Sequence, residues 1–244
     1  MAVNSPSTLV TIVSLTLDID IDTLSTVASA SQFACFNHDI EFSHLVVCPN
    51  SAAKHKLNGF EQSNYSVSLL RDPGLGIYSA FNLAVEHSRN EGYVIFLSAG
   101  DTFKEDVKIA SNLFRQDFSL VAFAVNIRSE SVDFIFSPYL DGYLRNSIPH
   151  SSLFTRVADI KNVGNFPLDL GSAADFYMTA MIVRSKEFKI HIDSRAICTF
   201  HLGGVSSNFS SIKYYIKALD RLKLNYFQRG YLIVRKIISY LKYR

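Results

Sequence analysis

The sequence predicts an α/β protein in which helices cover a mostly parallel β-sheet. Short apolar stretches rich in β-branched residues alternate with a helical pattern through the first hundred residues, as in sheets whose parallel strands are joined by helices. Hydrophobic residues make up 48% of the 244 residues and charged residues 19%. This balance supports a large core and excludes a disordered chain.

The first half supplies four strands and two helices. The predicted strands are short apolar runs that end in turn residues, and they cover Leu9–Leu15, Phe42–Cys48, Tyr65–Leu70 and Tyr93–Leu97. A helical composition covers Thr23–Ala34. A clearer helix follows Gly76, because its apolar residues recur on one face: Ile77, Ala80, Phe81, Ala84 and Val85.

The second half is less regular. Apolar runs predict strands at Leu120–Asn126, Val132–Phe136, Lys189–Ile192 and Ala196–Phe200. Residues Asp169–Val183 are predicted to form a loop that leads into a helix.

Residues 209–244 form a basic tail. They carry nine Lys and Arg residues and a single acid, Asp220, so the tail has a net charge of about +8 and the rest of the chain about −6. Two stripes recur at helical spacing: Ile212, Tyr215, Ile216, Leu219 and Leu222, then Val234, Ile237, Ile238 and Leu241. Such basic amphipathic helices suit an anionic membrane surface. A helical pair packed on the domain or on a second subunit is the alternative, and no motif supports nucleic-acid binding.

Cysteine usage and the N-terminal residues bear on the compartment. The three cysteines show no CxxC spacing, which favours a reducing compartment, and the first residues lack a signal-peptide pattern. No apolar run reaches the length of a membrane-spanning helix. We therefore expect a cytoplasmic protein whose tail lies at the inner face of the cell membrane.

Polar residues follow the ends of the four strands predicted in the first half. Asp18 follows the first strand, the Pro49 turn the second, Asp72 the third and Asp101 the fourth. Ligands of open parallel sheets bind beyond the carboxyl ends of the strands. Topology alone therefore gathers these residues around one binding site.

One segment resembles a known family. Residues 71–103, RDPGLGIYSAFNLAVEHSRNEGYVIFLSAGDTF, are similar to the middle of family 2 glycosyltransferases, enzymes of the Rossmann-like GT-A fold that move a sugar from a nucleotide-sugar to an acceptor. Four later segments match the family in order: IPHSSLFTR at 148–156, VGNF at 163–166, AADF at 173–176 and HLGGVS at 201–206. The match spans roughly residues 9–208.

The resemblance implies a domain organisation and an activity. A GT-A domain would cover residues 1–208, with a nucleotide-sugar half at about 1–101 and an acceptor half at 102–208, before the basic tail at 209–244. The activity would be an inverting, metal-dependent transfer of a hexosyl or related sugar. The acceptor would be a glycan or a lipid-linked sugar in the biosynthesis of a cell-surface polysaccharide, such as a capsule or lipopolysaccharide.

Two other functions compete with this one. Gly74 and Gly100 stand where the family pattern has Asp, so the alternative is a catalytically inactive GT-A-like protein that binds carbohydrate or a partner protein. An oxidoreductase is disfavoured, because the first strand is followed by Thr16-Leu17-Asp18 and not by glycines.

Asp101 and His201 are the metal ligands that the resemblance implies, for Mn²⁺ or Mg²⁺. A departing diphosphate gathers negative charge, and the hard divalent cations that neutralise it prefer carboxylate ligands. A contact with the diphosphate is the other role that the resemblance implies for His201. The alternatives are an acidic turn after a strand for Asp101 and a core histidine for His201.

Asp175 is implied as the general base, which takes the proton of the acceptor hydroxyl as that oxygen attacks the anomeric carbon. The alternative is a carboxylate that only stabilises a helix N-terminus. The resemblance assigns His150 and Ala174 to acceptor binding. The residues that it assigns to the nucleotide-sugar are Thr16, Asp18, Asp72, Ser98, Ala99 and Gly100.

Overall fold

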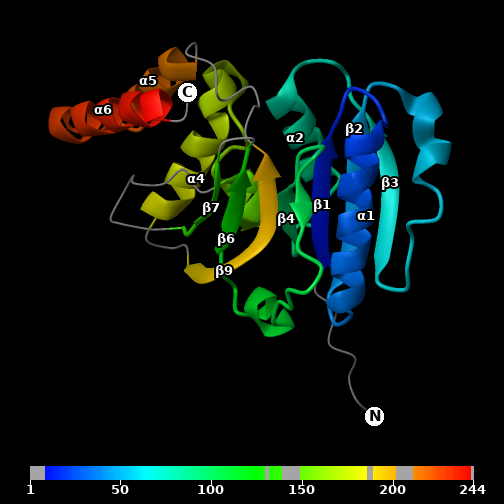
Figure 1. The fold of residues 1–244 in the computed structure, drawn as a ribbon. Helices are drawn as coiled ribbons and strands as arrows, with labels where there is room; N and C mark the ends of the chain where they lie inside the picture. The colour runs from blue at the N-terminus through cyan, green and yellow to red at the C-terminus, as the bar shows by residue number, and fades with distance from the viewer. Residues whose placement is uncertain (1–8, 130–131, 139–148, 186–188, 202–210, 243–244) are drawn as a thin grey trace.

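The structure is a computed structural model that describes residues 9–129, 132–138, 149–185, 189–201 and 211–242. One sheet runs through the domain and helices cover both of its faces (Figure 1). The strands are β1 (Leu9–Leu15), β2 (Glu41–Cys48), β3 (Tyr65–Arg71), β4 (Tyr93–Phe96), β5 (Thr102–Phe103), β6 (Leu120–Arg128), β7 (Asp133–Phe136), β8 (Leu153–Arg156) and β9 (Ile190–His201).

The helices lie between and after these strands. The α-helices are α1 (Ile21–Phe36), α2 (Ile77–Glu86), α3 (Val157–Asn162), α4 (Ala174–Arg184), α5 (Ser211–Arg221) and α6 (Tyr226–Lys242). The 3-10 helices are η1 (Ser51–Leu57), η2 (Ser111–Arg115), η3 (His150–Ser152) and η4 (Leu168–Ala173). This arrangement confirms the predicted α/β class.

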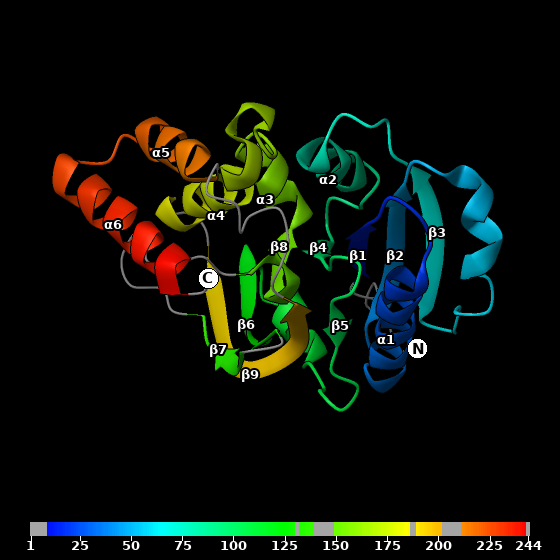
Figure 2. The same ribbon diagram turned by 45° about the horizontal axis from the view of Figure 1, so that its top comes forward.

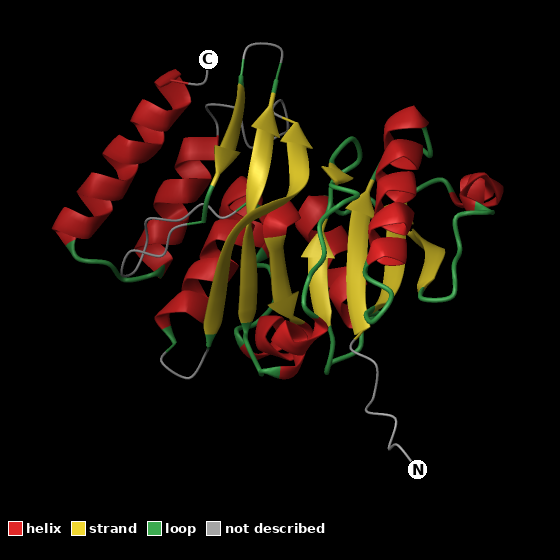
Figure 3. Cartoon of the chain, turned by 60° about the horizontal axis from the view of Figure 1, so that its bottom comes forward, coloured by secondary structure: helices red, strands yellow, loops and turns green. Residues whose placement is uncertain are grey.

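The strand order is β3-β2-β1-β4-β8-β6-β9-β5, with β7 paired to β6. Strands β3, β2, β1 and β4 are parallel to their neighbours, so their carboxyl ends meet at one edge, as predicted. Strand β8 is antiparallel to both β4 and β6, and β9 runs parallel to β6 (Figure 3). The sheet is therefore continuous from the first half of the chain into the second.

Alternation along the strands builds a core on each face of the sheet. On one face, Val13, Val94 and Phe96 pack with α2, while Val10, Ile12 and Ile95 of the same strands belong to the core that includes α1. Successive side chains of a strand point to opposite faces, so strands buried on both faces are apolar at nearly every position. This explains why β1 and β4 read as apolar runs in the sequence, whereas the edge strand β3 reads as an alternating pattern.

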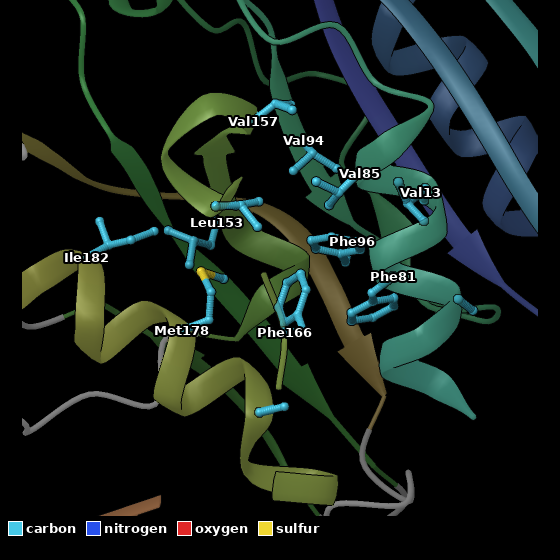
Figure 4. Packing of buried hydrophobic residues seen from close by; sticks show 14 of the residues in the cluster. Val13, Phe81, Val85, Val94, Phe96, Leu153, Val157, Phe166, Met178 and Ile182 are labelled. Atoms are coloured by element: carbon cyan, nitrogen blue, oxygen red, sulfur yellow. The ribbon is translucent and has the colours of Figure 1, made fainter. Parts of the chain in front are cut away.

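The α2 core joins the two halves of the domain. Phe166 packs edge-to-face with Phe81 and Phe96, with ring centroids 5.5 and 5.3 Å away, and lies between α2 and Met178 of α4 (Figure 4). Asn82 of α2 holds the backbone of Phe166 from both sides, since its amide donates to the carbonyl and its Oδ1 accepts from the N–H, each at 2.9 Å. Helix α2 is thereby joined to the segment that leads into η4 and α4.

Two strands predicted near the end of the domain form one. Residues Lys189–Ile192 and Ala196–Phe200 were expected as separate strands, but β9 runs unbroken from Ile190 to His201. The intervening residues form an irregularity in the pairing with β6, where Asp193 accepts hydrogen bonds from the backbone and side chain of Arg195. A bulge of this kind interrupts the alternation without ending the strand.

The described part of the basic tail consists of α5 and α6, which lie at the opposite end of the molecule from β3 (Figure 2). None of the helices among the described residues combines the length and the apolar composition of a membrane-spanning helix. Ile148 of the IPH segment and residues 202–206 of the HLGGVS segment lie outside the described residues.

Candidate active site

The carboxyl edge of β1, β2 and β3 carries the residues expected to contact a nucleotide. The Thr16 hydroxyl donates to the carbonyl of Asp18 at 2.5 Å, and the Asn50 amide lies 3.5 Å from Asp18 Oδ1. Asp72 follows β3, where its N–H donates to the carbonyl of Cys48 and its Oδ1 accepts from the N–H of Gly74 at 2.9 Å. These turns are held by their own hydrogen bonds at one edge of the sheet.

The Ser98–Asp101 turn follows β4, and Thr26 of α1 holds it. Gly100 has φ +92°, a conformation that glycine adopts without the strain a side chain would bring. The Thr26 hydroxyl accepts from the N–H of Gly100 at 2.9 Å and donates to the carbonyl of Asp101 at 2.8 Å. Glycine is thus needed at this position for a tight turn, whatever the turn binds.

The Asp101 carboxylate lies inside the protein, only 2% exposed. Its Oδ1 accepts from the backbone N–H of His201 at 3.0 Å, while its Oδ2 is buried without a hydrogen-bond partner among the described residues. Burial raises the pKa of Asp101 to about 7, and the hydrogen bond from His201 acts in the opposite direction. Burying a charged carboxylate whose oxygen has no hydrogen-bond partner costs free energy. Protonation of Asp101, or a cation bound to it, would lower this cost.

Asp101 fits a divalent cation only as a single protein ligand. Among the described residues, no group of three or more His, Cys, Asp or Glu side chains converges to hold a metal. Mg²⁺ in nucleotide sites is commonly bound by one or two carboxylates together with substrate phosphates, and the unsatisfied Oδ2 suits that arrangement. The backbone of His201 contacts Asp101, while the role of its exposed imidazole as a ligand stays a prediction.

His150 connects the Ser98–Asp101 turn to Asp175. Its Nε2 lies 3.3 Å from Ser98 Oγ, and its Nδ1 lies 4.0 Å from Asp175 Oδ2. The ring sits between Phe81 and Phe200, with centroids 6.0 and 6.3 Å away. Burial lowers the pKa of His150, and the neighbouring Asp175 carboxylate acts in the opposite direction. Residues from η3, α4 and the end of β4 thus form one polar cluster.

Tyr78 is a member of this cluster that the sequence did not single out for a role. Burial raises the pKa of Tyr78 well above its usual range, and the charge of Asp175 and a side-chain hydrogen bond with it add to the shift. The phenol ring packs against Phe81 and Phe166, at 5.6 and 5.8 Å between centroids. The available signal was its place in the GIYSAFN segment, one turn before Asn82.

Asp175 is half-buried in the first turn of α4, with its side chain 34% exposed. Its Oδ1 accepts from the N–H of Phe176 at 2.7 Å, a local contact at the helix start. Its Oδ2 faces His150. Asp175 therefore lies where a carboxylate that only stabilises a helix N-terminus would lie. It also has the polar neighbours that a general base needs.

Helix α5 packs against η4, the segment that precedes Asp175, and forms ion pairs with it. Asp169 of η4 forms ion pairs with Lys217 at 2.9 Å and Arg221 at 3.0 Å. Gly171 has φ +45°, and a Cβ there would lie 2.8 Å from the ring of Tyr214. Contact of the tail with η4 was not predicted, because it depends on residues more than forty positions apart.

The structure thus places the expected site residues at three neighbouring locations. Thr16, Asp18 and Asp72 line the edge of β1 to β3, whereas Ser98, His150 and Asp175 form the polar cluster, and the Asp101 turn lies between α1 and the end of β9. Ala99 is half-buried in that turn. Ala174 is fully buried, so its methyl group packs in the core, and its assignment to the acceptor stays a prediction.

Comparison with solved structures gives clear matches. TarS of S. aureus in complex with UDP matches with a TM-score of 0.60 and 17% identity, over 91% of this chain and 68% of that one. TarS with UDP-GlcNAc matches at 0.59 and 15%, over 96% and 72%. The mannosyltransferase PcManGT from Pyrobaculum calidifontis, in complex with GDP-Man and Mn²⁺, matches at 0.57 and 12%, over 86% of this chain and 61% of that one.

These likenesses establish the fold. The chain has a GT-A-like glycosyltransferase fold, and it spans 43% of the longer TarS structure. No protein-family model matches the sequence, and no curated protein does. Membership of family 2 therefore stays a prediction.

Proposed function

We propose that this protein is a glycosyltransferase that moves a sugar from a nucleoside-diphosphate sugar to an acceptor hydroxyl. The observation that carries the proposal is the cluster at the carboxyl edge of β4, where Asp175 faces His150 and, through it, the Ser98–Asp101 turn. The GT-A-like fold supports it, because the matched proteins were solved with UDP, UDP-GlcNAc and GDP-Man.

The donor would bind across the edge of β1 to β4. Asp18 and Asp72 each use Oδ1 within their own turns, and the exposed Asp18 and the partly exposed Asp72 would be accessible to a ribose or a base. The diphosphate would lie at the Ser98–Asp101 turn. A Mn²⁺ or Mg²⁺ ion held by Asp101 would neutralise negative charge there.

In the transfer step, the anomeric carbon forms one bond and loses another, and one proton moves. The acceptor oxygen attacks the anomeric carbon, the bond from that carbon to the diphosphate oxygen breaks, and the nucleoside diphosphate leaves with the electron pair. Asp175 takes the proton of the acceptor hydroxyl. Attack from the side opposite the leaving group inverts the anomeric centre.

Tyr78 and His150 would hold Asp175 in place for this step. Tyr78 is half-buried beside Asp175, and its hydroxyl would restrict the carboxylate to a narrow range of orientations. The Nδ1 of His150 lies 4.0 Å from Asp175 Oδ2 and its Nε2 lies 3.3 Å from Ser98 Oγ, so the ring would hold the carboxylate beside the Ser98–Asp101 turn.

The finer assignments belong to the same proposal. We place the protein among the family 2 enzymes that act on a glycan or lipid-linked acceptor in cell-surface polysaccharide biosynthesis, at the cytoplasmic face of a membrane. The order of the matched segments and the basic tail support this placement.

A screen of UDP- and GDP-sugars with and without Mn²⁺ tests the proposal through release of nucleoside diphosphate. We expect one donor to be turned over, and Asp175→Asn to lower kcat on the order of 100-fold or more, since general-base catalysis contributes about 10²–10⁴-fold. Glu86→Gln is the matched control, an exposed acid at the end of α2. Binding of carbohydrate without turnover of any donor would favour the inactive alternative.

A further inference from the structure

Helix α6 carries an unusual concentration of exposed apolar side chains. Among the described residues, fourteen large hydrophobic side chains are exposed, and six of them lie on this one helix. They are Tyr226 (91%), Phe227 (92%), Tyr231 (50%), Val234 (55%), Ile237 (38%) and Ile238 (57%). Single exposed hydrophobic residues are ordinary, but six on one helix indicate a surface that has a partner.

The exposed residues form a continuous stripe. Phe227, Tyr231, Val234 and Ile238 follow one another at spacings of four, three and four residues, which places them on one face of the helix. The opposite face packs on the protein, where Leu232 is 4% exposed and Lys236 lies 5.7 Å from the ring centroid of Tyr215 in α5. Helix α6 is therefore attached by one side and presents an apolar stripe on the other.

Helix α5 has no such face, although both helices of the tail were expected to be amphipathic. Ala218 and Leu219 are fully buried, and Leu222 just beyond the helix is 2% exposed. Lys217 and Arg221 are engaged with Asp169 of η4. The apolar stripe of α5 is thus used within the molecule, and only α6 offers a surface.

The charge around the α6 stripe is positive. Arg235 flanks it, lying 5.8 Å from the ring centroid of Tyr231, and the single acid of the tail, Asp220, is already paired with Arg229. Even when Asp169 is counted against Lys217 and Arg221, residues 209–244 keep a net charge of about +7, so two copies of the tail would repel each other across a symmetric interface. An apolar stripe beside uncompensated positive charge instead suits a layer of anionic headgroups over hydrocarbon.

We propose that the outer face of α6, formed by Phe227, Tyr231, Val234 and Ile238 and flanked by Arg235, docks the protein on an anionic phospholipid membrane. The helix lies in the plane of the interface and inserts its aromatic and aliphatic side chains below the headgroups. Helix α5 ties this surface to η4, the segment that precedes Asp175. This inference deepens the membrane placement given in the proposed function, but docking requires no sugar transfer, so docking and transfer can fail separately.

Sedimentation with vesicles, using the full chain and no substrate, tests the proposal. We expect the protein to sediment with phosphatidylcholine vesicles that contain phosphatidylserine, and much less with phosphatidylcholine alone. Replacing Phe227→Ser together with Ile238→Ser should lower the partition coefficient by about 10-fold or more, because two exposed side chains no longer insert. Arg235→Gln should lower it about 5-fold, and only on the anionic vesicles.

Phe36→Ser with Ile135→Ser is the matched control, since it removes two exposed hydrophobic side chains, 48% and 59% exposed, that belong to α1 and β7 and not to α6. This control should bind as the wild type does, and all variants should keep the wild-type circular dichroism spectrum. Three results would overturn the proposal: no binding of the wild type to anionic vesicles, an equal loss in the control, or a dimer in light scattering that the Phe227→Ser and Ile238→Ser pair dissociates.

Discussion

The burial of Asp101 makes stability depend on pH in a defined direction. Its pKa is raised from 3.8 to about 7 in the folded protein, because burial disfavours the charged form. Between these two values the folded state holds a proton that the unfolded state has lost. Stability therefore falls as the pH rises through this range, the reverse of the usual behaviour of a paired carboxylate.

The magnitude follows from the two pKa values. At about 1.4 kcal/mol for each tenfold change in proton affinity, a rise from 3.8 to about 7 corresponds to a loss on the order of 4 kcal/mol across the whole range. Linkage places about 3 kcal/mol of this loss between pH 5 and pH 8, since the folded carboxyl is largely protonated at the lower limit. The group is only 2% exposed, so screening by solvent reduces the effect little.

Urea denaturation at pH 5, 6, 7 and 8 measures this dependence, with wild type compared to Asp101→Asn. Other groups also titrate: the buried His44, with its pKa lowered to about 3, makes the protein more stable as the pH rises toward 6.5. The contribution of His44 cancels when the free energy of unfolding of the variant is subtracted from that of the wild type at each pH. We expect the variant to gain stability relative to wild type as the pH rises, and Asp106→Asn, an exposed acid, to follow the wild type.

Parallel curves for wild type and Asp101→Asn from pH 5 to pH 8 would refute the reasoning. They would mean that the carboxylate is hydrated or paired in solution.

Three further predictions concern packing around the site. Gly171→Ala should lower stability by about 1–3 kcal/mol and reduce kcat, because φ +45° and the ring of Tyr214 both oppose a side chain; thermal unfolding and turnover measure the two effects. Phe166→Ala should cost about 3–5 kcal/mol in urea denaturation, since the ring is 2% exposed among other aromatic rings. Asn82→Asp should cost about 1–3 kcal/mol, because it places an oxygen against the carbonyl of Phe166, whereas Asn90→Asp on the exposed surface should be nearly neutral.

The first half of the fold was predictable because its signals are local. Strands β1 and β4 are buried at nearly every position and so read as apolar runs, whereas β2 and the edge strand β3 alternate buried with less buried residues, and α2 places its apolar residues on a single stripe. Strand β8, by contrast, has four residues and no periodicity, and it forms only because β4 and β6 flank it. Such non-local pairing leaves no trace in the sequence of the strand itself.

The sequence predicts which residues make up the candidate site, and their function stays a prediction; it does not predict the contacts among them. Strand ends and matched segments located Asp101 and Asp175, since topology fixes where a parallel strand ends. The depth at which Asp101 is buried depends on β9, which arrives a hundred residues later and donates from His201. The contact of Tyr78 with Asp175 similarly requires that α2 and α4 be packed together, which Asn82 and Phe166 bring about.

Calorimetric titration of the wild-type chain with UDP and with GDP, each with and without Mn²⁺, tests the central claim most directly. The account predicts that one nucleoside diphosphate binds, that Mn²⁺ strengthens its binding, and that Asp101→Asn removes the metal dependence while leaving weak metal-free binding. Binding that is equally strong with and without Mn²⁺ and unchanged in Asp101→Asn, or no binding of either nucleotide, would contradict it.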